Sequence, residues 1–119
     1  MSPEELASAL DEFTGTDGYH KHWLGLRYTD GVKFLADNAG AYWLIDAIGS
    51  HQPTCKNDKM LCDFQIWRLE VHDDRSAELI CLRDSNDEAF RQHLEFTDFP
   101  KIGLKLYLEN GVLMLPSER

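Results

Sequence analysis

The stretch YTDGVKFLADNAGAYWLIDAI, residues 28–48, carries two helix signatures in direct succession and decides the helical part of the fold. Thr29 or Asp30 can cap the first helix, and Gly40 can take the left-handed conformation that ends it. A second helix is expected to follow at once, over residues 41–50. The two helices should therefore meet in a tight corner.

Helical phase divides this stretch into two faces. Apolar residues at helical spacing predict one buried stripe on each helix: Val32, Leu35, Ala36 and Ala39, then Ala41, Leu44, Ile45 and Ile48. Phe34, Tyr42 and Trp43 point away from these stripes, next to Asp46. Either the rest of the fold covers them and Asp46 accepts a hydrogen bond from a Trp or backbone N–H, or they line an aromatic pocket with Asp46 as its polar anchor.

The flanking segments are less uniform. Ser2, Pro3 and Glu5 form a capping box that predicts a helix start, and Leu6, Ala9, Leu10 and Phe13 supply its apolar face. Residues 19–28 form a ring-rich connector without a clear period. Residues 51–60 are polar and contain a proline, which predicts a mobile loop after a helical half of about residues 1–50.

Residues 61–116 alternate as strands do. The phase changes at Ile66–Trp67, which predicts a bulge or cover on both faces. Asn110-Gly111 predicts a two-residue hairpin turn that places Leu106, Leu108, Leu113 and Leu115 on one buried face. The expected fold is α+β, with three N-terminal helices packed on a C-terminal four- or five-stranded antiparallel sheet.

Length and composition limit the class of protein. The chain has 119 residues, of which 43% are hydrophobic, so we expect a single globular domain over residues 1–119. Its apolar runs are too short to cross a membrane, and its start lacks the features of a signal peptide. An odd number of cysteines (Cys55, Cys62 and Cys81) favours reduced thiols. We therefore expect a cytoplasmic protein without a membrane partner.

The net charge of −9 disfavours direct binding to nucleic acid, because an acidic surface repels phosphates. Solubility is the ordinary reason for such a charge. The alternative is an acidic nucleic-acid mimic that occupies a basic groove on a partner.

Chemical motifs are scarce. The sequence contains neither a phosphate-binding loop nor a nucleophile elbow. His20 and His22, with His51 and Cys55, form the best set of metal ligands, but their spacing matches no zinc motif, so we predict no metal and no cofactor. A small enzyme that uses Asp46 with one of these histidines as acid–base groups is the alternative to a non-catalytic protein.

Several strings together resemble an uncharacterised bacterial family of domains of unknown function, often found in genomes rich in phage and plasmid material. The resemblance extends over residues 13–117, and the strings that carry it are His22-Trp23-Leu24, residues 28–33, 39–48, 63–67, 97–100 and 106–113. The family implies no activity for any residue. The resemblance makes a role as a small accessory protein of a mobile element plausible.

The sequence thus favours a small acidic binding or protein-interaction module without catalytic activity. Its partner would be a protein or a small ligand, and its oligomeric state is open. The candidate ligand-binding residues are Phe34, Tyr42, Trp43, Asp46, His20 and His22.

Overall fold

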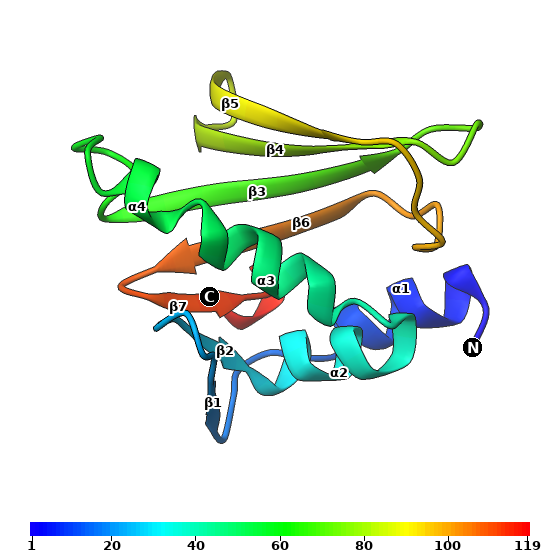
Figure 1. Cartoon of the computed structure of the whole chain (residues 1–119). Helices are drawn as coiled ribbons and strands as arrows, with labels where there is room; N and C mark the ends of the chain where they lie inside the picture. The colour runs from blue at the N-terminus through cyan, green and yellow to red at the C-terminus, as the bar shows by residue number, and fades with distance from the viewer.

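The chain folds into four α-helices on one face of a seven-stranded sheet (Figure 1). The structure is a computed structural model that describes all of residues 1–119. The helices are α1 (Pro3–Asp11), α2 (Asp30–Ala39), α3 (Tyr42–Ser50), α4 (Gln52–Cys55) and the 3₁₀ helix η1 (Pro116–Glu118). The strands are β1 (Tyr19–Lys21), β2 (Arg27–Thr29), β3 (Phe64–Val71), β4 (Ala77–Asp84), β5 (Asp87–Leu94), β6 (Leu104–Glu109) and β7 (Val112–Met114).

The sheet is larger than expected and is mixed. Its strand order is β1-β2-β7-β6-β3-β4-β5, and the pairing of β2 with β7 is parallel. The expectation of a four- or five-stranded antiparallel sheet confined to the C-terminal half is therefore wrong, as is that of three purely N-terminal helices. The connector over residues 19–28 contains β1 and β2, whose three residues each are too few to show an alternating pattern.

The helix boundaries follow their capping signals. Ser2 Oγ accepts a hydrogen bond from the Glu5 N–H at 3.1 Å, and Glu5 Oε1 accepts one from the Ser2 N–H at 3.2 Å. Thr29 Oγ1 accepts the Val32 N–H at the start of α2. Gly40 ends α2 with a φ of 60°, and α3 begins two residues later. Local chemistry alone accounts for this corner.

The C-terminal hairpin has the register that its turn predicts. Asn110 and Gly111 have φ values of 53° and 77°, and Glu109 pairs with Val112. The four leucines assigned to the inner face are all buried. Strand β3 is regular at the phase change, Ile66–Trp67, and the register shifts instead lie between β4 and β5.

The core lies between the helices and the inner face of the sheet. Trp67 and Leu69 of β3 are almost completely buried, as are the apolar stripes of α2 and α3 except for Ala39, which is half-buried. Residues 51–60 are not simply a loop, because α4 lies there and buries Cys55. All three cysteines are free. Every helix is too short or too polar to span a lipid bilayer.

Candidate functional site

The β1–β2 hairpin ends in a tight turn, residues 22–25, which we call the Trp23 turn. The His22 N–H donates to the Leu26 carbonyl, the Gly25 N–H donates to the His22 carbonyl, and Gly25 has a φ of 101°. A positive φ of this kind suits glycine and makes the sharp reversal possible. The turn projects Trp23 outward, with 77% of its surface exposed. Such exposure is unusual for the largest apolar side chain.

Asp46 of α3 binds two side chains of this turn. Its Oδ1 accepts a hydrogen bond from Trp23 Nε1 at 3.1 Å and lies 2.6 Å from His22 Nε2. The other ring nitrogen of His22, Nδ1, accepts the Leu24 N–H at 3.1 Å. Nδ1 therefore carries no hydrogen, and His22 is the Nε2–H tautomer that donates to Asp46. One carboxylate thus orients both a buried imidazole and an exposed indole.

The hydrogen bond from His22 lowers the pKa of Asp46, and the bond from Trp23 contributes less, while burial works in the opposite direction. The carboxylate is therefore ionised at neutral pH, and its two hydrogen bonds are charge-assisted. Both nitrogens of His22 are occupied. His22 would have to break one of these two hydrogen bonds before it could take a proton from a substrate, which is unfavourable for a general base.

A second group of polar side chains lies on β1 and α2. His20 Nε2 lies 2.9 Å from Asp30 Oδ1, and its ring packs on Tyr28. The Tyr42 hydroxyl donates to Asp37, which also pairs with Lys33. The bond from Lys33 is the main cause of the lowered pKa of Asp37, and the nearby His20 adds a small contribution.

Phe34 and Trp43 lie elsewhere. The Phe34 ring packs on Phe13, with 5.4 Å between ring centroids, so the segment that follows α1 covers it in part. Trp43 is half-buried in a shallow depression beside Leu94 and Thr97. The structure therefore brings Asp46 and His22 together and places His20 near the Tyr42–Asp37 pair, but it does not gather the six candidates into one pocket. A role of these six residues in binding stays a prediction.

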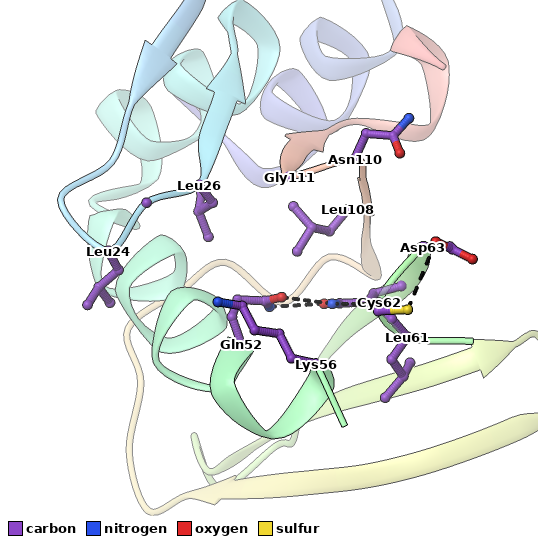
Figure 2. A pocket seen from close by; sticks show the side chains of 12 residues that line it. Leu24, Leu26, Gln52, Lys56, Leu61, Cys62, Asp63, Leu108, Asn110 and Gly111 are labelled. Carbon is purple, nitrogen blue, oxygen red and sulfur yellow. Dashed lines mark hydrogen bonds between the residues drawn. The ribbon is translucent and has the colours of Figure 1, made fainter. Parts of the chain in front are cut away.

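A cavity of about 240 Å³ opens directly beside the Trp23 turn (Figure 2). Its walls come from four segments of the chain: residues 24–26, α4 with the residue that follows it, residues 61–65, and the β6–β7 turn. Figure 2 shows Leu26 and Leu108 facing the Gln52 amide across this space. Small-molecule pockets usually measure 300–1,000 Å³. The cavity is thus sized for one side chain of a partner better than for a whole cofactor.

The polar floor of this cavity is fully hydrogen-bonded. Gln65 is only 3% exposed, and its amide exchanges two hydrogen bonds with the Gln52 amide at 2.8 and 3.0 Å. Its oxygen also accepts the Trp67 Nε1–H, and its nitrogen also donates to the Leu61 carbonyl. All four hydrogen-bonding positions of the Gln65 amide are occupied. The floor is therefore rigid and does not itself require a ligand.

Sequence reasoning missed Trp23 and the cavity as site features. Trp23 lies in a connector without helical or strand periodicity. The absence of apolar partners at either spacing was the only signal in the sequence that this ring could be exposed. The cavity had no such signal, because its walls come from four separate segments of the chain.

The set considered for metal binding is dispersed. His20 and His22 bind different carboxylates, His51 Nε2 lies 2.7 Å from Gln92 Oε1, and Cys55 is the buried last residue of α4. The structure contains no group of three or more His, Cys, Asp or Glu side chains that could hold a metal ion.

The fold and this surface together define an α+β protein with an exposed aromatic turn anchored to a helix. A family model described as "Family of unknown function (DUF6876)" matches residues 4–119, so the chain belongs to that family. The resemblance to a family of unknown function seen in the sequence is thereby confirmed. Comparisons with curated proteins and with solved structures give no match.

Proposed function

We propose that this protein is a non-catalytic protein-binding module that engages its partner through the Trp23 turn and the cavity beside it. The observation that carries the proposal is that Trp23 is 77% exposed and yet held by a hydrogen bond to an ionised carboxylate. Interface hot spots are enriched in tryptophan, which supplies a large contact area with few rotatable bonds. An indole already held in place loses less conformational entropy on binding.

The neighbourhood of Trp23 fits the same interpretation. Leu24, the residue after Trp23, is 38% exposed and lines the cavity, so an apolar side chain of the turn borders a space for one partner side chain. Lys56 and Asp63 place one positive and one negative charge among the cavity residues. A partner segment with a large apolar side chain next to polar groups would match this arrangement.

The two alternatives receive less support. For an acid–base enzyme that uses Asp46, the histidine in contact with this carboxylate is His22, and both nitrogens of that ring are already hydrogen-bonded. A nucleic-acid mimic needs unpaired carboxylates gathered on one face. Many carboxylates are instead paired with cations, and these ion pairs are spread over different elements. Asp37 pairs with Lys33 on α2, and Glu88 pairs with Arg91 on β5.

The test is a capture experiment from native host cells, followed by affinity measurements with the purified partner. The variant is Trp23→Ala, and the matched control is Phe96→Ala, which removes a comparably exposed ring (71%) from another part of the surface. We expect Trp23→Ala to weaken binding roughly 30-fold or more, as for a hot-spot residue. Phe96→Ala should leave the affinity unchanged.

Two results would contradict the proposal. One is a partner that binds wild type and Trp23→Ala equally well. The other is an equal loss in both variants, which would indicate non-specific adhesion of exposed rings. The variant Trp23→Phe adds a finer measurement, because it keeps a ring but removes the N–H that binds Asp46. It should have an intermediate affinity if a fixed orientation contributes.

A further inference from the structure

Two cations face each other across neighbouring strands on the outer face of the sheet. Arg68 of β3 and Lys105 of β6 are direct cross-strand partners. Like charges in this arrangement are destabilising. Glu70 pairs with Arg68 and Asp73 pairs with Lys101, but no carboxylate pairs with Lys105. This unfavourable pair occurs in a chain whose net charge is −9.

Arg68 also has an unsatisfied donor. Its Nε is buried and makes no hydrogen bond. Glu70 Oε1 lies 3.0 Å from that nitrogen, within ion-pair distance, but the N–H is not aligned with it. A buried donor without an acceptor costs free energy, so Glu70 leaves the guanidinium of Arg68 incompletely satisfied.

Both side chains line a cavity of about 500 Å³ between the end of β3 and residues 101–105. This volume lies within the range of small-molecule pockets. The cavity residues include the apolar Val71, Ile102 and Leu104. Its charged residues are three cations, Arg68, Lys101 and Lys105, and one anion, Glu70, so their sum is 3 − 1 = +2.

The wall opposite β3 is firmly held. Arg75 lies in the β3–β4 turn, and its guanidinium donates to the carbonyl oxygens of Thr97 and Phe99. The Phe99 side chain is completely buried. The segment that leads into residues 101–105 is thus anchored at two points, so the cavity exists before any ligand arrives, which lowers the entropic cost of binding.

We propose that this cavity binds a small organic anion. The carboxylate or phosphate group of the ligand contacts Lys105 and the guanidinium of Arg68, which can bind an oxyanion through two parallel hydrogen bonds. The apolar part of the ligand lies on Ile102, which is partly exposed, whereas Val71 and Leu104 are buried in the core. The site is separate from the Trp23 turn, because Leu104 and Lys105 begin β6, whereas the cavity of Figure 2 lies at the end of β6.

Titrations with four probes test the proposal, followed by backbone amide NMR shifts and calorimetry. Hexanoate carries a carboxylate with an alkyl chain, phenyl phosphate carries a phosphate with a ring, inorganic phosphate lacks an apolar part, and hexanol lacks the charge. We expect hexanoate or phenyl phosphate to shift the amides of residues 68–71 and 101–105. The probe that binds more tightly shows whether the site prefers a carboxylate or a phosphate group. Inorganic phosphate should bind more weakly than either probe.

Lys105→Gln should weaken binding of the tighter probe roughly tenfold or more, since it removes a charge-assisted hydrogen bond. Lys21→Gln, a change of an exposed lysine on the edge strand β1, should leave the affinity unchanged. In the absence of any ligand, Lys105→Gln should raise the unfolding midpoint, because it relieves the repulsion of Arg68. This gain shows that a loss of binding is not a loss of folding.

Three results would overturn the proposal. The first is that neither hexanoate nor phenyl phosphate shifts these amides. The second is that hexanol shifts them as much as hexanoate does, which would show that charge contributes nothing. The third is that Lys105→Gln binds the probe as tightly as wild type.

Discussion

Gly49 of α3 lies directly beneath Leu24 of the Trp23 turn. A Cβ placed on Gly49 would come within 3.0 Å of Leu24 Cδ1, 3.2 Å of Leu24 Cβ and 3.4 Å of His22 Cε1. The absence of a side chain at Gly49 therefore lets the turn approach the helix closely enough for His22 and Trp23 to reach Asp46.

Gly49→Ala should displace the turn with little loss of stability. Alanine favours a helix by about 1 kcal/mol over glycine, and the partly exposed Leu24 can move outward, so the free energy of unfolding should change by less than about 1 kcal/mol. The His22–Asp46 bond should lengthen, which NMR detects as a weakened or broadened His22 Hε2 signal. Gly15→Ala is the control, because a Cβ there meets nothing within 4 Å. An unchanged signal in Gly49→Ala would show that the turn accommodates the methyl group without moving.

The Asp46 carboxylate should make a small contribution to stability that depends on pH. Its pKa in the folded protein is below the ordinary value of 3.8. A lowered carboxyl pKa stabilises the fold above the unfolded pKa, and this stabilisation is lost as the pH falls through the folded pKa. Asp46→Asn should thus be less stable than wild type at pH 7, by less than about 1 kcal/mol because the side chain is half exposed.

The difference between Asp46→Asn and wild type should shrink below pH 3.8 and vanish at lower pH. Urea denaturation of both proteins from pH 2 to 7 measures it. A constant difference over this range would mean that the loss arises from the shape of the side chain and not from its charge.

Arg75 combines a strained backbone with two useful hydrogen bonds. It has a φ of 69°, and its guanidinium binds the carbonyl oxygens of Thr97 and Phe99. Arg75→Ala should lose about 2–3 kcal/mol of stability, since both bonds involve a charged donor. Arg75→Gly loses the same bonds but suits the left-handed conformation, so it should be more stable than Arg75→Ala by roughly 1 kcal/mol. Denaturant unfolding compares the two, and equal stabilities would contradict the role assigned to the backbone.

Gln65→Met should be strongly destabilising although it conserves volume. It removes four hydrogen bonds and leaves the Trp67 Nε1–H and the Gln52 amide without their partners, at a cost of about 2–4 kcal/mol. The double variant Gln52→Met/Gln65→Met also removes the Gln52 amide, which the single variant Gln65→Met leaves without its partner. Its loss should be smaller than the sum of the two single losses. Additive losses would show that the two amides act independently.

The helices and the last hairpin could be predicted because their signals are local. Ser2, Thr29 and Gly40 act on residues within four positions, and Asn110-Gly111 determines its own register. The strands β1 and β2 could not, because three residues show no period, and Arg27 finds its sheet partner only at Val112. Two of the seven strands were therefore missed, and the distance in sequence between β2 and β7 concealed their parallel pairing.

The candidate site was predictable to a similar extent. Helical phase placed Asp46 off the apolar stripe, and a hydrogen bond from a tryptophan N–H was one expected outcome. The same phase put Phe34 and Trp43 on that side, but it could not show that Phe13 covers the first ring. Helical phase also could not predict the contact between His22 and Asp46. These residues are 24 positions apart, and the hairpin that brings them together has no signal in the sequence.

The parallel pairing of β2 with β7 also has a consequence for synthesis on the ribosome. The strand next to β2 is made from residues 112–114, which are synthesised long after β2 has left the exit tunnel. Until then β1 and β2 can form no more than an isolated hairpin, which is marginally stable in water. Completion of the sheet must therefore wait until β7 has left the ribosome.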